Sequence, residues 1–214
     1  TYIDKDSTNK LTQSWDAQMR LEMEYQIDSM NKIILRPQIG YTHTNSAQMN
    51  DYTYDRDSVR INDGYQNKNS LQEEINASIR AIYNHKFAKA GRALTMQGNV
   101  SFKNTKGETD TYAWDRMTNR ALVDQYTLSG NNALNYSLRT SYVEPIYGKN
   151  HFLETALLLS GSSRNSVKDQ YTMNSLTDDY QYDSVFSNEL SNNMYTEQLE
   201  LNYRWVTEKI DLTA

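Results

Sequence analysis

The feature that most constrains this chain is a strict alternation of apolar and polar side chains over residues 15–27. The odd positions, from Trp15 to Ile27, are all apolar, and the even positions, from Asp16 to Gln26, are all polar or charged. Successive side chains of a β-strand point to opposite faces, so the pattern predicts a strand with one apolar and one polar face. At about 3.3 Å per residue the segment would be about 43 Å long. Strands of soluble proteins usually hold about 5 or 6 residues, whereas a tilted strand that crosses a bilayer needs about 9 to 11, so the length favours a membrane.

The same alternation returns along the rest of the chain. It predicts further strands near residues 33–42, 75–84, 94–102, 134–142, 152–161 and 198–205, and the start of an eighth at 210–214. Because the last segment is short and the chain opens with residues that resemble a loop, we expect a segment of a larger barrel. The predicted fold class is all-β, an antiparallel up-and-down transmembrane β-barrel represented here by about eight strands, or four hairpins.

The predicted connections alternate between short and long. Short turns are expected near 28–31, 88–91, 147–150 and 207–209, where Asp28, Asn31, Gly91, Gly148 and Asn150 suit the backbone of a turn. The other connections, at 46–70, 105–131 and 164–194, are predicted to be long loops. Short periplasmic turns and long extracellular loops are typical of outer-membrane barrels.

Tyrosines mark an internal repeat. Tyr25, Tyr83, Tyr142 and Tyr203 each lie shortly before a predicted short turn, and each belongs to the apolar face of its strand. The chain 1–214 therefore divides into units of about 59 residues, each a hairpin with a long loop, within a single barrel segment that contains no plug domain. Their similar height predicts an interfacial aromatic girdle.

Composition excludes several other classes. The net charge of −5 gives no electrostatic reason to expect nucleic acid, and the absence of cysteine excludes disulfides and thiolate metal sites. The longest apolar run, 156–159, is far too short for a membrane helix. The histidines His43, His85 and His151 are isolated from other metal-ligating residues, and no nucleophile elbow or phosphate-cradling loop is present. We expect no enzyme activity and no cofactor, with His85 and His151 in interfacial or solvated positions.

One hairpin carries a family resemblance. Its sequence, Tyr142-Val143-Glu144-Pro145-Ile146-Tyr147-Gly148-Lys149-Asn150-His151-Phe152-Leu153-Glu154, resembles that of Gram-negative outer-membrane β-barrel proteins allied to TonB-dependent transporters. The resemblance implies a barrel of about 22 strands in the cell outer membrane, with an N-terminal plug. It also implies TonB-coupled uptake of siderophores, cobalamin, glycans or peptides. The implied partners are outer-membrane lipid, the plug domain and TonB of a full-length transporter, and a surface lipoprotein.

Aromatic–acidic pairs recur in the predicted loops. The candidate ligand-binding residues are Tyr54 with Asp55, Trp114 with Asp115, and Tyr182 with Asp183. Tyrosine and tryptophan can stack on a sugar or grip a partner protein. Alternatively, the strands continue beyond the membrane and these aromatics form cross-strand pairs. The acidic groups Asp55 with Asp57, and Asp178, Asp179 with Asp183, offer oxygen atoms to Ca²⁺ or are hydrated surface.

Three functions fit these patterns. In a transport barrel the apolar face meets lipid and the polar face lines the lumen, with the charged residues Arg20, Glu22, Arg80, Arg139, Glu200 and Arg204. In a soluble β-sandwich or lipocalin-like binding module, the apolar face packs inward instead. A complete small eight-strand barrel with a structural or adhesive role is the third alternative.

Overall fold

The protein folds into one antiparallel β-sheet. We describe a computed structural model for residues 2–148, 150–206 and 211–213, and within them the all-β antiparallel prediction is confirmed. The strands are β1 (Tyr2–Arg20), β2 (Met23–Gln26), β3 (Asn31–Arg56), β4 (Val59–Lys86), β5 (Ala93–Asp115), β6 (Arg120–Tyr147), β7 (His151–Asn174), β8 (Asp179–Tyr182), β9 (Asn188–Val206) and β10 (Asp211–Thr213). This part of the chain holds no helix that is long and apolar enough to cross a membrane.

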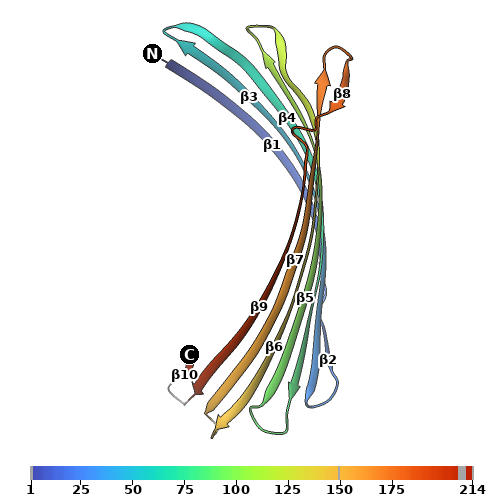
Figure 1. Cartoon of the computed structure of the whole chain (residues 1–214), viewed down its shortest axis with the longest axis vertical. Helices are drawn as coiled ribbons and strands as arrows, with labels where there is room; N and C mark the ends of the chain where they lie inside the picture. The colour runs from blue at the N-terminus through green and yellow to red at the C-terminus, as the bar shows by residue number, and fades with distance from the viewer. Residues whose placement is uncertain (1, 149, 207–210, 214) are drawn as a thin grey trace.

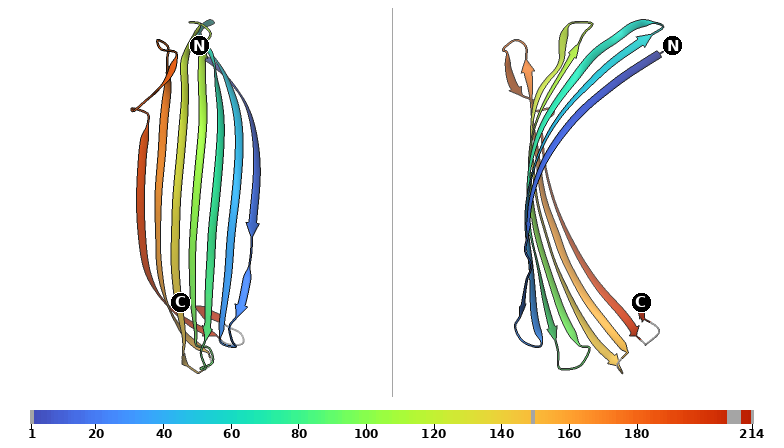
Figure 2. Two further views of the ribbon diagram at one scale, coloured as in Figure 1. Left: turned by 90° about the vertical axis from the view of Figure 1, so that its right-hand side faces the viewer. Right: turned by 180° about the vertical axis from the view of Figure 1, so that it is seen from behind.

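The sheet is a single open layer. Its strand order is β1-β3-β4-β5-β6-β7-β9-β10, while β2 pairs with β3 and β8 pairs with β7. The long strands lie side by side and bend together into a curved wall (Figures 1 and 2). Since β1 and β10 stand at opposite ends of this order, the sheet is not closed, and the barrel and its strand number stay predictions. The predicted turn at 207–209, both ends of the predicted eighth strand (Ile210 and Ala214) and Lys149 lie outside the described residues.

The prediction of three long loops was wrong, because the strands continue through most of these segments. β3 has 26 residues and β4 has 28, and only two residues, Asp57 and Ser58, separate them. Both have positive φ, 49° and 66°, as the favoured two-residue hairpin turn requires. The apolar–polar alternation fades in these segments, but the backbone pairing does not depend on it. Stiff hairpins therefore stand where loops were expected.

The turn residues at the opposite end agree with the sequence analysis. Gly91 and Gly148 have positive φ, 84° and 58°, which glycine adopts without steric cost. Asp28 accepts hydrogen bonds from the backbone N–H groups of Met30 and Asn31 at 2.7 and 2.8 Å. The aspartate therefore closes its turn through its own side chain, as expected of this residue.

A proline interrupts the first strand. The register runs unchanged from Arg20 opposite Gln38 to Met23 opposite Leu35, yet Leu21 and Glu22 belong to neither β1 nor β2. Between them the backbone N–H of Leu21 donates to the carbonyl of Pro37 at 3.0 Å. Proline has no N–H to return the bond. The strand predicted at 15–27 therefore keeps one direction and one register, but a hydrogen bond of its ladder with β3 is missing at Pro37.

Two aromatic side chains cover glycines on neighbouring strands. Tyr136 of β6 stands opposite Gly161 of β7, and Tyr52 of β3 stands opposite Gly64 of β4. A Cβ atom at Gly161 would overlap the hydroxyl and ring of Tyr136. At Gly98 of β5, by contrast, an added Cβ would meet no atom within 4 Å. Gly161 thus provides the space in which the Tyr136 ring lies.

This contrast predicts opposite effects of the same substitution. Gly161→Ala should lower the free energy of unfolding by about 1 kcal/mol, because the Tyr136 ring must move. Gly98→Ala should leave it unchanged or raise it by about 0.5 kcal/mol, because glycine is a poor strand residue. Urea unfolding measures both. Equal effects at the two positions would contradict the packing described for Tyr136.

Candidate functional site

A continuous apolar band crosses one face of the sheet. Residues paired across neighbouring strands share a face, so the register assigns every side chain of the long strands to one of two faces. The band is formed by alternate residues of 15–27, 33–41, 75–83, 94–102, 134–142, 153–159 and 199–205, one segment on each long strand, with β1 and β2 counted together. Each segment matches a strand predicted from alternation.

The apolar band runs obliquely to the strands. Following the pairing from Trp15 across the sheet leads to Glu189 of β9, but the band on β9 begins ten residues later, at Leu199. At its other border the pairing from Tyr25 leads to Leu199, six residues before Trp205. The band therefore shifts by about one to two residues at each of the six steps between strands. With about 3.3 Å per residue and about 4.8 Å between strands, this shift corresponds to a strand tilt of roughly 40°.

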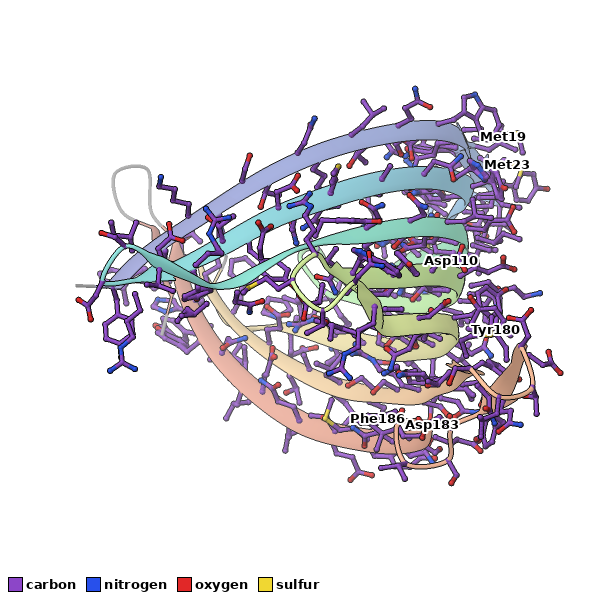
Figure 3. The ribbon with its side chains drawn as sticks, turned by 90° about the horizontal axis from the view of Figure 1, so that it is seen from above. Met19, Met23, Asp110, Tyr180, Asp183 and Phe186 are labelled. Carbon is purple, nitrogen blue, oxygen red and sulfur yellow. The ribbon has the colours of Figure 1, made fainter. Side chains whose placement is uncertain are left out.

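The apolar side chains point outward from the curved sheet. Figure 3 shows the labelled Met19 and Met23 on the outer side of the bend, where they are 56% and 52% exposed. On β5 the apolar Met96, Val100 and Phe102 are exposed, whereas the alternating Thr95, Gln97, Asn99 and Ser101 are half-buried. Among the described residues only Ala113 and Ala156 are buried hydrophobic side chains. This exposure pattern is the reverse of a soluble protein's.

Aromatic side chains border the apolar band near the short turns. Tyr83 stacks on His85, which contacts Phe87, which in turn contacts Tyr142. Farther along the border, His151 stacks on both Tyr203 and Trp205, while Tyr25 is 66% exposed. The four tyrosines predicted to form a girdle thus lie along one border of the band, together with Phe87 and Trp205. Their interfacial role stays a prediction.

The opposite border is also aromatic. Trp15 of β1 and Tyr41 of β3 meet edge to face with ring centroids 5.7 Å apart. The Tyr41 hydroxyl donates a hydrogen bond to Glu73 Oε1 at 2.9 Å, just beyond the band. Amphipathic rings with their polar tips turned away from an apolar zone are typical of side chains at a membrane–water interface. His43 lies at this level, 3.6 Å from Glu73.

Glu144 links two neighbouring hairpins near the short turns. Arg92 donates to both carboxylate oxygens, at 2.7 and 2.9 Å, and Lys89 Nζ donates to Oε1 at 2.6 Å. The Tyr142 hydroxyl adds a bond at 2.8 Å. The hydrogen bonds from Arg92, Lys89 and Tyr142 lower the pKa of Glu144 from 4.5 to about 2. Glu144 of the Tyr-Val-Glu-Pro sequence therefore holds adjacent hairpins together. The sequence pattern alone did not indicate this role.

Ion pairs cover the polar face at the height of the apolar band. Glu22 binds Arg36 at 2.9 Å, and Glu74 binds Lys103 at 2.9 Å. Arg139 of β6 reaches Glu200 of β9 at 2.7 Å. Ala156 of β7 is the residue paired with Glu200, and it is almost fully buried. The alternation predicted this face correctly for Glu22, Arg139 and Glu200, but it gave no indication of their partners.

The six candidate ligand-binding residues lie at the ends of the long hairpins. Asp115 accepts bonds from Met117 N–H and the Thr118 hydroxyl, and Asp183 accepts bonds from Val185 and Phe186 N–H groups. Asp55 binds Arg60. Within the described residues, no hydrogen bond, ion pair or ring contact joins one of the three aromatic–acidic pairs to another. Ligand binding by these residues stays a prediction, but all three aspartates already stabilise their own hairpins.

Aromatic side chains of the long hairpins contact neighbouring side chains, some across strands and some along one strand. Tyr126 stands opposite Tyr171, with ring centroids 6.3 Å apart, and Tyr171 contacts Tyr182 at 5.6 Å. Trp114 stacks on Tyr112, and Tyr54 donates to Asp4 across the β1–β3 pair. The hydrogen bond to Asp124 raises the pKa of Tyr180 to about 12.

An ion-pair network missed by the sequence analysis ties two hairpins together at this end. Arg116 follows β5 and binds both Asp51 of β3 and Asp63 of β4, at 2.5 and 2.9 Å. Arg60 binds Asp63 as well, at 2.7 Å. In the part of the chain that the structure describes, no group of three or more histidine, cysteine, aspartate or glutamate residues gathers as metal ligands do.

Comparison with known proteins identifies no family for this chain. No model of a known protein family matches the chain, and no curated protein sequence matches it. The resemblance to proteins allied to TonB-dependent transporters therefore stays an expectation drawn from the hairpin at 142–154.

The Glu144 contacts predict an acid-sensitive contribution to stability. Because the folded pKa is lowered to about 2, the bonds to Glu144 stabilise the protein fully above its ordinary pKa of 4.5. The contribution should fade as the pH falls from 4.5 toward 2. Urea unfolding should thus show a constant difference between wild type and Glu144→Gln above pH 5, and a shrinking difference below 4.5. Glu189→Gln, which removes a carboxylate without a described ion pair, is the control, and the same pH profile there would contradict this assignment.

Proposed function

We propose that this chain forms part of the wall of a transmembrane β-barrel in a Gram-negative outer membrane. The observation that carries the proposal is the oblique apolar band on the outer face of a single-layer sheet. Its tilt of roughly 40° lies within the range of about 35–45° found in outer-membrane barrels. Aromatic residues at both borders of the band support the same placement.

The open edges of the sheet support membership of a larger barrel. β1 pairs on one side only, with β3, along all 19 of its residues. Lipid cannot bond to unpaired N–H and C=O groups, so membrane-spanning sheets close on themselves. We therefore infer that further strands complete the barrel next to β1 and next to β9 and β10. A complete small eight-strand barrel fits less well, because this sheet is open.

A soluble β-sandwich or lipocalin-like module is less well supported. A sandwich needs a second sheet packed on the apolar face, and the described residues form one sheet. Lipocalin-like modules direct their apolar residues into an enclosed interior, whereas Met19 and Met23 lie on the outside of the bend (Figure 3).

We further propose that the complete protein is a TonB-dependent-type receptor or transporter for nutrient uptake. Two observations support this proposal. One is the hairpin resemblance, and the other is the polar inner face rich in ion pairs, which suits a hydrated lumen that contains a plug. In this proposal the long hairpins are extracellular. The partners are outer-membrane lipid, the plug domain, TonB and a surface lipoprotein.

A charge in the middle of the apolar band tests the lipid contact. Leu138 lies at the centre of the band on β6, and Leu138→Arg should cost about 2–4 kcal/mol on insertion. Ser137→Arg puts the same side chain on the polar face of the same strand and should insert normally. Folding yields of the full-length variants into phospholipid vesicles measure the difference. Equal yields would contradict a lipid-facing band.

Single cysteines at the two ends of β3 test the orientation. The chain contains no cysteine, so Ser58→Cys and Ser29→Cys each introduce one thiol, at a long-hairpin turn and at a short turn. A maleimide too bulky for the pores of the outer membrane should label Ser58→Cys on intact cells. Ser29→Cys should react only after the membrane is permeabilised. The opposite labelling pattern would reverse the proposed topology.

A further inference from the structure

Three arginines gather on the polar face, level with the middle of the apolar band. Arg20 ends β1, Arg36 lies on β3 and Arg80 lies on β4. They line a hollow of about 330 Å³, together with Glu22, Ser78 and Asn99. The register sets Arg36 directly opposite Arg80. We call Arg20, Arg36 and Arg80 the arginine cluster.

The arginine cluster carries more positive charge than its surroundings neutralise. Glu22 is the single carboxylate that lines the hollow, and it is bound to Arg36. Arg20 donates to the Gln18 amide oxygen at 2.8 Å, and Arg80 makes no ion pair or hydrogen bond with the described residues. Like charges placed directly opposite each other destabilise a sheet. The Arg36–Arg80 pair therefore has a cost, which Glu22 offsets at Arg36 but not at Arg80.

The charge balance differs on the far side of the same face. There Arg139 is met by two carboxylates, Glu200 at 2.7 Å and Glu154 at 3.7 Å. Single arginines on this face thus do not require an outside partner. The arginine cluster differs because three guanidinium groups share one carboxylate.

We propose that the arginine cluster binds an anionic solute through a phosphate or carboxylate group. Guanidinium groups bind both anions with paired, charge-assisted hydrogen bonds, and the free donors of Arg80 and Arg20 are available for them. Ser78 and Asn99 offer further hydrogen-bonding groups in the same hollow. The hollow has the volume of a small-molecule site. This inference rests on the proposed function, because solutes reach the polar face if it lines the lumen of a barrel.

Titration with inorganic phosphate tests the proposal. The full-length protein in detergent, held at constant ionic strength with chloride, should bind phosphate saturably in isothermal calorimetry. Arg80→Gln should weaken this binding about tenfold or more, and Arg80→Lys should weaken it less. Arg164→Gln removes an arginine of the same face outside the cluster and should change the affinity less than twofold. If Arg80→Gln fails to fold, Arg20→Gln takes its place with the same expectation.

Three outcomes would overturn the proposal. The first is no saturable phosphate binding by the wild type, and the second is equal weakening by Arg164→Gln and Arg80→Gln. The third is an Arg80→Gln variant that melts at a lower temperature with unchanged phosphate affinity, which would identify a carboxylate of the protein itself as the partner. Phosphate binding in detergent does not depend on membrane insertion, so failure here is distinguishable from failure of the Leu138→Arg test.

Discussion

The hydrogen-bonded ladder between neighbouring strands is the interaction on which the rest of this structure depends. A conventional apolar core is absent from the described sheet, where Ala113 and Ala156 are the buried hydrophobic side chains. Each long strand is held in place by its neighbours along many paired positions, 19 between β1 and β3 and 18 between β7 and β9. The place where a ladder bond is missing, at Pro37, is also where β1 ends and β2 begins. In the proposed barrel, a bilayer would supply the apolar medium for the outer face of this sheet.

Charge-assisted contacts tie the hairpins together at both ends of the sheet. Glu144 joins two hairpins near the short turns, and Arg116 joins two hairpins near the long ones. Both lie beyond the apolar band. Within the apolar band the described ion pairs lie on the polar face, and the His43–Glu73 pair of the apolar face lies just beyond the border of the band. The distribution of charge therefore follows the same boundary as the distribution of apolar side chains.

The strands of the apolar band could be predicted from the sequence because a strand with one apolar and one polar face alternates with a period of two. The hairpin extensions could not be predicted, because their sequences show no regular apolar–polar alternation. Tyr54, Trp114 and Tyr182 were recognised as a recurring signature, but the turn-capping roles of Asp115 and Asp183 depend on backbone geometry. The arginine cluster was equally hidden. Arg20 and Arg80 were assigned to the correct face, but only the register of β1, β3 and β4 brings them and Arg36 to one hollow.

The lengths of the hairpins have a consequence for access to the barrel. Beyond the band, the strands continue from Tyr41 to Arg56 on β3 and from Phe102 to Asp115 on β5, and from Leu159 to Asn174 on β7. These three extensions are similar in length when counted from the border of the apolar band. The turns at their ends therefore lie at nearly the same distance from the band and form a level rim. At about 3.3 Å per residue and a tilt of roughly 40°, the rim stands roughly 35 Å beyond the border of the apolar band. In a closed barrel such a collar would act as a rigid vestibule, and a solute would be selected by size before it met the lumen.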